Sequence, residues 1–242
     1  MKFEFQLGFP PTLPSMSAST RTPRHRPPAR QDGVATRQQL LQAAGEVFAA
    51  HGYARATSKE ICQRANANVA AVNYHFGGKD GLYAAVLEEA HRRLISIESL
   101  AAVAQSDIDA RSKLRMFIGR IVSEIANRDE SSWELRVLSR ELLSQSPLME
   151  RMITNQVLPK VKIFSGIVAE IMRLPVTHPA VGRSLVNIVG PCIFLLIANR
   201  LLQQRILPQL DLDAAGLTEH MVCFALAGMQ AIAQEAKRSG SK

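Results

Sequence analysis

Apolar residues recur at helical spacing along almost the whole chain after about residue 34, and after Leu94 no segment shows the alternation of a half-buried strand. The pattern predicts an all-α protein. Beyond a first helical unit that ends near residue 97, polar or proline-bearing breaks separate five further predicted helices, at about 109–127, 131–145, 147–174, 179–204 and 214–237. We expect Pro159 and Pro191 to distort the third and fourth of these helices, because proline removes a backbone donor and crowds the preceding turn.

The segment from Thr57 to Lys79 contains two short amphipathic helices together with signals for their ends. Thr57 is a favourable N-cap and Glu60 follows three positions later, which is a capping-box pattern. After a turn rich in asparagine, Asn68 is a favourable N-cap for the second helix. Two glycines end that helix and Lys79 opens the next one. This order predicts a helix-turn-helix whose second helix enters a DNA major groove.

The helix that follows Asn68 has residues suited to DNA contact. Ala70 and Ala71 are small enough to let backbone approach base edges and offer methyl groups to thymine. Asn73 can hydrogen-bond a base edge. Lys79 and the N-terminus of its helix together suit a phosphate, because both are positively polarised. We therefore expect base contacts from the short helix and a phosphate contact beside it.

The residues from Thr36 to about Leu94 resemble the N-terminal part of the TetR/AcrR family of bacterial transcription regulators. The run from Val72 to Phe76 resembles that family's Leu-Tyr-Tyr-His-Phe signature, and Thr57 with the following serine resembles the Thr-Thr that opens its second helix. The resemblance implies phosphate contacts from Ser58, Tyr74 and Lys79. It implies positions near bases or adjacent backbone for Lys59, Val69, Ala70, Ala71, Asn73 and His75.

Two positions depart from the family pattern. Ala70 replaces a frequent glycine or proline, and Asn73 replaces the commoner tyrosine, as in a subset that reads Ala-Ala-Val-Asn-Tyr-His-Phe. That subset is similar to the CecR-type subgroup of the family. Two alternatives remain at single residues: His75 braces the recognition helix instead of contacting DNA, or Tyr74 buries its ring and only its hydroxyl reaches outward.

Charge and composition agree with a nucleic-acid partner. The formal net charge of +8 favours a polyanion, although much of it lies in an arginine- and proline-rich tail. We expect residues 1–33 to be disordered, as a passive tail or as a basic arm. The predicted organisation continues with a helix-turn-helix domain at 34–80, a connecting helix at 81–98 and an effector-binding and dimerisation domain at 99–242.

Several classes of protein lack support in this sequence. It has no glycine-rich phosphate loop, no paired metal-ligand motif and no nucleophile elbow, so we expect no enzyme, no catalytic residue, no metal site and no cofactor. Its three widely spaced cysteines suit reduced, buried thiols. The most apolar stretch, 185–202, is interrupted by polar residues and proline, so we predict a buried helix and no membrane partner. With no export signal, a cytoplasmic location follows.

The last two long helices, at about 179–204 and 214–237, have more apolar residues than a surface helix needs. Small residues, including Gly182, Gly190 and Gly228, permit close contact between helices. We therefore predict a homodimer through this pair, with ordinary intramolecular core as the alternative. A dimer sets two recognition helices one DNA turn apart, which predicts a palindromic operator in double-stranded DNA.

An effector site is expected in the C-terminal helices, where Pro191 frees a carbonyl near Asn187 and widens the space beside it. The candidate effector-binding residues are Trp133, Arg136, Phe164 and Asn187. Mostly apolar surroundings suit a small lipophilic effector that releases a homodimeric repressor from its operator. The alternatives are an activator of the same fold or, in a different class, a helical ligand carrier without specific DNA binding.

Overall fold

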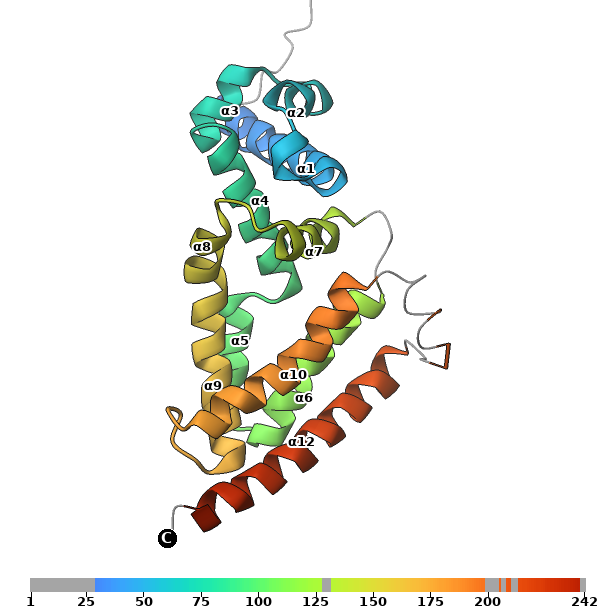
Figure 1. Ribbon diagram of the computed structural model, residues 1–242. Coiled ribbons are helices and arrows are strands. Elements are labelled where there is room, and N and C mark those ends of the chain that lie inside the picture. Colours follow the sequence, from blue (N-terminus) through green and yellow to red (C-terminus); the bar gives the residue numbers. More distant parts are fainter. Residues whose placement is uncertain (1–28, 128–131, 199–204, 206–207, 210–212, 240–242) are drawn as a thin grey trace, which may run out of the picture.

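The computed structural model describes residues 29–127, 132–198, 205, 208–209 and 213–239, and the secondary structure within these ranges is helical, with no strand. The predicted all-α class is confirmed. The helix-turn-helix lies at one end of the molecule and the longer C-terminal helices at the other, with α4 running between them (Figure 1). Most of the predicted tail lies outside the described residues.

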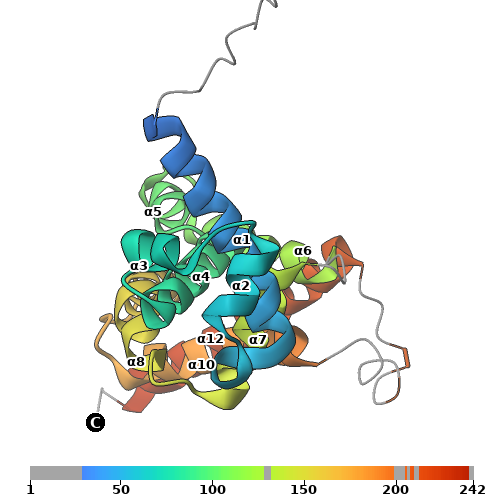
Figure 2. The same cartoon turned by 90° about the horizontal axis from the view of Figure 1, so that it is seen from above.

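Four helices form the N-terminal part: α1 (Ala29–Arg55), α2 (Ser58–Arg64), α3 (Val69–Phe76) and α4 (Lys79–Leu94). The first begins earlier than expected, because residues 29–33 were predicted to belong to the tail. Gly52 interrupts α1 with a φ of 74°, in the left-handed region that favours glycine. Seen from above, α1, α2 and α3 lie over α4 (Figure 2).

The C-terminal part contains α5 (Ile97–Gln105), α6 (Ala110–Ala126), α7 (Trp133–Ser144), α8 (Met149–Met152), a π-helical segment (Ile153–Val157), α9 (Leu158–Met172), α10 (Pro179–Ile197) and α12 (Ala214–Ser239). All five helices predicted beyond the first unit are present within a few residues of the expected bounds, apart from the ends that lie outside the described ranges. The short helix α5 was not predicted separately. Ser96 caps it by accepting a hydrogen bond from the Ser99 amide.

The two interior prolines have different outcomes. Before Pro159 the helix widens into the π-helical segment and then resumes as α9, so the third predicted helix is divided as expected. Pro191 lies inside α10, which remains one assigned helix from end to end. The distortion predicted at Pro159 is therefore confirmed, whereas the bend at Pro191 stays a prediction.

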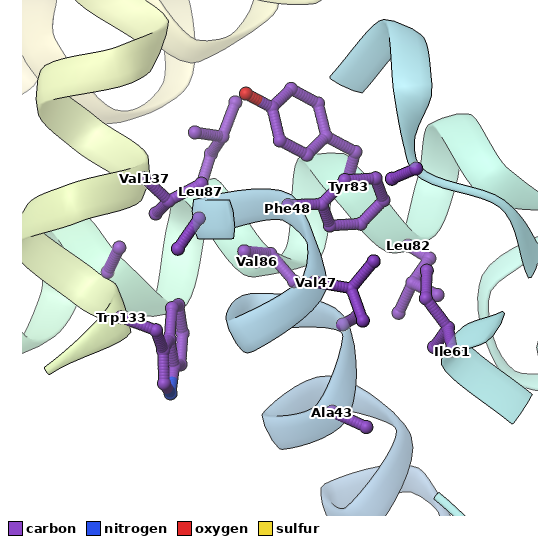
Figure 3. Close-up of a cluster of buried hydrophobic side chains, with 14 of the residues drawn as sticks. Ala43, Val47, Phe48, Ile61, Leu82, Tyr83, Val86, Leu87, Trp133 and Val137 are labelled. Carbon is purple, nitrogen blue, oxygen red and sulfur yellow. The ribbon is translucent and has the colours of Figure 1, made fainter. Parts of the chain in front are cut away.

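Buried side chains form two hydrophobic clusters. The first joins α1–α4 to α7, although α7 belongs to the predicted C-terminal domain. In Figure 3 Trp133 and Val137 of α7 flank the same core as Phe48, Tyr83 and Leu87. A Cβ added at Gly45 of α1 would overlap the Trp133 ring, so only glycine permits this approach. Helix α7 is thus part of the platform beneath the helix-turn-helix.

A buried polar link strengthens this connection between α4 and α7. The Tyr83 hydroxyl donates to Oε2 of Glu141 at 2.6 Å, and the other carboxylate oxygen accepts from the backbone amide and hydroxyl of Ser146 at 3.1 and 2.7 Å. Burial, followed by the bond to Glu141, raises the pKa of Tyr83. Because Glu141 is fully buried, these donors are what makes its burial tolerable.

The second cluster packs α5, α6, α9, α10 and α12 together. Helix α12 lies along α6 on the outer side of this bundle (Figure 1). Within the described residues, α10 is the one helix long and apolar enough to cross a membrane by length and composition. It is also a core helix, since Val181, Ile188 and Cys192 are buried in the cluster.

Candidate functional site

The turn into α2 is built as the sequence predicts, with one difference. Thr57 is the N-cap, and its Oγ1 accepts a hydrogen bond from the Glu60 amide at 3.2 Å. The Glu60 carboxylate pairs with His51 at 3.3 Å and more distantly with Arg64. Glu60 therefore links α2 to α1, and the described contacts include no return bond to Thr57. The following residues, Ser58 and Lys59, are half-buried and exposed respectively.

Helix α3 is bounded by the predicted residues. Asn66 adopts a left-handed backbone with a φ of 48°, and the Asn68 side chain accepts from the Ala71 amide at 2.8 Å. Gly77 ends the helix in the left-handed conformation, and its amide donates to the Asn73 carbonyl. These caps fix the short helix at both ends, so its outer face is presented in one orientation.

The outer face of α3 combines apolar, amide and phenolic groups. Val69, Ala70 and Asn73 are exposed, and Ala71 is half-buried against the first cluster. The Tyr74 side chain is 84% exposed, so its ring projects outward and the alternative of a buried ring is wrong. Among the expected DNA-contact residues of α3, Val69, Ala70, Asn73 and Tyr74 are therefore open to solvent, whereas Ala71 and His75 are partly buried.

His75 lies beside this surface, partly buried. Its ring is 4.9 Å from the Tyr74 ring and 6.2 Å from the Phe76 ring, measured between centroids. The Arg37 guanidinium lies over the Phe76 ring, 5.1 Å from its centroid. These contacts fit a bracing role for His75. Arg37, an exposed cation of α1, is a further residue at this site. The sequence did not indicate it, because its contact with Phe76 joins distant parts of the chain.

Lys79 lies at the N-terminus of α4. Its ammonium is 4.6 Å from the centroid of the Tyr53 ring, and the Tyr53 hydroxyl donates to Oδ1 of Asp80 at 2.6 Å. That bond raises the pKa of Tyr53. Gly78, the N-cap, supplies no side-chain cap, so amides of the first turn are available to an anion. Tyr53 thus contacts both Lys79 and its neighbour Asp80 at the start of α4.

A second candidate site is an apolar cavity of about 240 Å³ at the junction of the two hydrophobic clusters. Several helices contribute to its wall, including the last turn of α4. The lining residues are His91, Leu94, Ile95, Phe117, Ile121, Ile125, Leu138, Leu142, Met152, Val157, Lys160, Val161, Phe164, Leu185, Val189, Cys192, Ile193 and Leu196. A molecule bound here touches both the connecting helix and the C-terminal bundle.

Among the predicted effector residues, Phe164 alone lines this cavity. Trp133 is buried against α1, where its Nε1 donates to Oε1 of Gln42 at 3.0 Å. Arg136 donates to the Ser132 carbonyl, and Asn187 is exposed. These three expectations need correction for this cavity, because composition does not reveal which face of a helix each residue occupies.

Two basic residues border the cavity where α9 meets α4. Lys160 is 7% exposed, and its Nζ donates to the His91 carbonyl at 3.2 Å. Burial lowers the pKa of Lys160 to about 8, although the Glu98 carboxylate opposes the shift. Burial, followed by the Lys160 charge, lowers the pKa of His91 to about 4. At pH 7 the imidazole is therefore neutral and most Lys160 is protonated.

The outer faces of α10 and α12 expose large apolar side chains. Phe224 of α12 is 75% exposed, and Val186 and Phe194 of α10 are also exposed. The expected small residues on these helices have open surroundings, since a Cβ added at Gly182, Gly190 or Gly228 would meet no other atom within 4 Å. Cys223 is exposed on the same helix as Phe224, so the expectation that every thiol is buried is wrong.

Comparisons with known proteins agree with this architecture. Residues 40–86 match the model of the bacterial regulatory proteins of the tetR family. Residues 110–232, more than half of the chain, match the C-terminal domain of the HTH-type transcriptional dual regulator CecR. The two matches together cover the helix-turn-helix and most of the C-terminal bundle.

Two curated proteins are similar over part of their length. The chain is 24% identical over 151 residues to the probable HTH-type transcriptional regulator YttP of Bacillus subtilis (strain 168), covering 60% of this chain and 72% of that protein. It is 31% identical over 120 residues to the HTH-type transcriptional dual regulator CecR of Shigella flexneri, covering 46% of this chain and 53% of CecR. The chain thus matches about half the length of CecR.

Solved structures show the same fold at low sequence identity. A TetR-like transcriptional regulator from Rhodococcus sp. RHA1 has a TM-score of 0.57 and 21% identity, covering 80% of this chain and 96% of that one. FadR from Bacillus subtilis, solved in complex with stearoyl-CoA, has a TM-score of 0.62 and 19% identity, covering 79% and 98%. With the two family matches, these findings show that the chain belongs to the TetR family of DNA-binding transcription regulators and has a CecR-type C-terminal domain.

Proposed function

We propose that the protein is a homodimeric repressor that binds a palindromic operator and is released by a small lipophilic effector. The observation that carries the DNA part is the exposed surface of α3 beside Lys79 and the first amides of α4. The proposal retains the division into a helix-turn-helix domain at 34–80, a connecting helix at 81–98 and an effector and dimerisation domain at 99–242. It requires a cytoplasmic protein without enzymatic activity.

On this surface, phosphate and base contacts have separate sources. We assign phosphate contacts to Ser58, Tyr74 and Lys79, because these side chains flank the helix and end in a hydroxyl or an ammonium. We assign base or adjacent backbone contacts to Lys59, Val69, Ala70, Ala71, Asn73 and His75. The assignment of a base contact is weakest for His75. Its partly buried ring lies beside the Tyr74 and Phe76 rings and so has less freedom to reach a base.

The exposed apolar faces of α10 and α12 support dimerisation. Phe224 and Val186 in water leave apolar area uncovered, and a second copy that covers it gains the corresponding free energy. Two copies related by a two-fold axis can present two recognition helices to successive major grooves. A single eight-residue helix gives too few contacts for a specific site, so dimerisation accounts for the specificity.

The position of the cavity supports an effector response. Its wall includes Leu94 and Ile95 at the end of the helix that begins with Lys79. A ligand that fits the cavity better in one arrangement of α4 shifts the dimer towards that arrangement, by no more than its differential affinity. The solved complex of FadR with stearoyl-CoA supports a lipophilic effector in a protein of this fold.

The first test is fluorescence anisotropy of the full chain on the DNA upstream of its own gene and on scrambled DNA, at two salt concentrations. A preference that survives the higher salt supports a sequence-specific regulator. Equal, salt-sensitive binding to both DNAs leads to selection of sites from random DNA. Failure of that selection favours the helical ligand carrier, and an increase in reporter transcription on binding favours an activator.

The contact assignment has a paired test on the selected operator. Lys79→Ala should weaken binding to every DNA and reduce the slope of log affinity against log salt by about 1. Asn73→Ala should mainly relax the base preference, at a cost of roughly 1–3 kcal/mol on the operator alone. Equal losses on all sequences for both variants contradict the assignment of Asn73.

The dimer has its own test by analytical ultracentrifugation. Phe224→Glu puts a charge in the proposed interface, so the variant should sediment as a monomer and lose operator affinity. Leu143→Glu is the matched control, because Leu143 is comparably exposed on α7. A dimer that survives Phe224→Glu, or that is lost equally in the control, contradicts this interface.

A further inference from the structure

The chemistry of the cavity wall narrows the class of effector. Its lining consists of aliphatic and aromatic side chains and the Met152 thioether, apart from His91, Lys160 and Cys192. No carboxylate, amide or hydroxyl side chain is among the described lining residues. Phe117 and Phe164 stack in the wall with their ring centroids 3.7 Å apart. The surface offered to a ligand is therefore apolar and partly aromatic.

The polar atoms of two of these three residues are already engaged by backbone. Nζ of Lys160 donates to the His91 carbonyl at the C-terminal end of α4, where a cation is favoured. Sγ of Cys192 contacts the Ile188 carbonyl at 3.6 Å within its own helix. The His91 ring is neutral because burial lowers its pKa to about 4. A cationic ligand has no carboxylate partner among the described lining residues, and an anionic ligand has Lys160 alone, whose ammonium already donates to the His91 carbonyl.

Nearby arginines do not change this conclusion. Arg93 and Arg120 border a separate groove on the other side of Ile95 and Phe117. Each is already paired with a carboxylate, Arg93 with Glu89 and Glu134 and Arg120 with Glu124. Neither lines the cavity. A charge buried there without a partner costs several kcal/mol, so ionic ligands are disfavoured.

The volume of the cavity and its exposure to solvent limit the size of a ligand and its entry. A cavity of about 150 Å³ is enough to hold benzene, so about 240 Å³ has room for a benzene ring with a short alkyl substituent. Two lining residues, Val161 of α9 and Ile193 of α10, are also exposed. The cavity wall therefore reaches the protein surface at these two residues.

We propose that this cavity binds a small, uncharged, apolar molecule of about the size of an alkylbenzene, and that Lys160 anchors α9 to α4 instead of binding a charged head group. The inference rests on the effector part of the proposed function and specifies its ligand. Binding is driven by burial of apolar surface and by contact with the Phe117–Phe164 pair.

The test uses three probes of nearly equal size and shape with different charge: isopropylbenzene, benzoate and benzamidine. Binding to the full-length protein is measured by isothermal titration calorimetry and by the shift of the unfolding temperature. We expect isopropylbenzene to bind at least roughly tenfold more tightly than either ion. This comparison within the wild-type protein needs no variant to fold.

Matched variants locate the site. Cys192→Met should weaken isopropylbenzene binding by filling the cavity, whereas Cys223→Met, at an exposed cysteine outside the lining, should not. Lys160→Met should leave isopropylbenzene affinity within about twofold, as should Lys162→Met at an exposed lysine of the same helix. Thermal unfolding of each variant checks that it is folded.

Three other outcomes overturn the proposal, each in a distinct way. Preferential binding of benzoate that disappears in Lys160→Met assigns Lys160 to an anionic head group. Isopropylbenzene binding that both cysteine variants retain puts the ligand elsewhere, and no binding of any probe refutes the ligand class. If isopropylbenzene binds in the cavity but leaves operator affinity unchanged, the ligand inference stands and the effector response fails.

Discussion

The two hydrophobic clusters differ in how completely they are filled. The first, beneath the helix-turn-helix, packs Gly45 directly against the Trp133 ring and satisfies the buried Glu141 carboxylate. The second leaves Phe224 and Val186 exposed on its outer helices. The cavity lies where the two clusters meet. The core beneath the helix-turn-helix is closely packed, whereas the space lies at the junction of the clusters and the uncovered apolar surface lies on α10 and α12.

This difference fits the tasks of the two regions. A recognition helix reads DNA only if its support holds its orientation, which favours dense packing and caps at both ends. A cluster that responds to ligands or to a second copy needs a cavity or an exposed face. Helix α4 belongs to the first cluster and its last turn lines the cavity, so the proposed effector response runs through this helix.

The largest expected difference between the clusters comes from removing an aromatic ring. Phe48 is fully buried in the first cluster, with its ring centroid 4.6 Å from that of Tyr83. Phe48→Ala should reduce the free energy of unfolding by roughly 3–5 kcal/mol, and Phe117→Ala, beside the cavity, by roughly 2–3 kcal/mol. Urea unfolding measures both. Equal losses contradict the claim that the clusters are packed differently.

The next prediction concerns how the free energy of unfolding depends on pH through His91, which lines the cavity between the two clusters. The folded protein holds the pKa of His91 at about 4, against an ordinary value of 6.5. Between pH 6.5 and about 4, His91 is protonated in the unfolded chain and neutral in the folded protein. Stability is therefore complete above pH 6.5 and falls as pH falls towards 4, by up to about 3 kcal/mol from this residue.

The variant His91→Gln isolates that contribution from other titrating groups. Urea unfolding at several pH values between 7 and 4 should give a shallower loss of stability for the variant than for the wild type. Parallel curves for the two proteins would show that His91 titrates normally in the folded state. The nearby Lys160 charge contributes to the lowered pKa, so Lys160→Met should reduce the same loss in part.

A single methyl group added at Gly45 tests how closely α1 packs against α7. Gly45→Ala should reduce the free energy of unfolding by roughly 1–3 kcal/mol, because its Cβ meets the Trp133 ring. Gly166→Ala on α9 is the control, since a Cβ there meets no other atom within 4 Å. The control should be stabilising by up to about 1 kcal/mol. A tolerated alanine at position 45 means that α7 can move away from α1.

The smallest expected effect is a gain in stability. Cys192→Met adds volume at the cavity wall, where space exists, and should raise the free energy of unfolding by about 0.5–1 kcal/mol. The same urea measurement serves, with Cys223→Met as the control at an exposed site. A loss of stability in Cys192→Met, with the control unchanged, would indicate that this part of the wall is already filled.

Much of the helix-turn-helix could be predicted because its signals are local. Thr57, Asn68 and Gly77 act through bonds to amides or carbonyls within four residues, so their order in the chain fixes α2 and α3. The expected contacts of Asn73 and Lys79 with DNA remain predictions. Arg37 and Tyr53 were not expected at this site, because each acts on a residue more than twenty positions away.

The residues that line the cavity were predicted poorly for the same reason. Trp133 and Arg136 have the residue types expected of a binding pocket, but α7 turns Trp133 towards α1. Lys160 and His91 were not among the predicted effector-binding residues, although the fold brings them together across 69 positions. Composition gives the number of apolar and polar groups in a domain, but it does not say which of them line a common space.

The sequence by itself therefore determined the all-α class, the caps and boundaries of the recognition unit and the family, because these depend on periodicity and on bonds between near neighbours. Only the tertiary structure decided that α7 supports the DNA-binding helices, that a cavity opens at the end of α4 and that Phe224 is left exposed. Those features depend on how helices distant in the chain pack, and side-chain volume and direction settle that packing after the helices have formed.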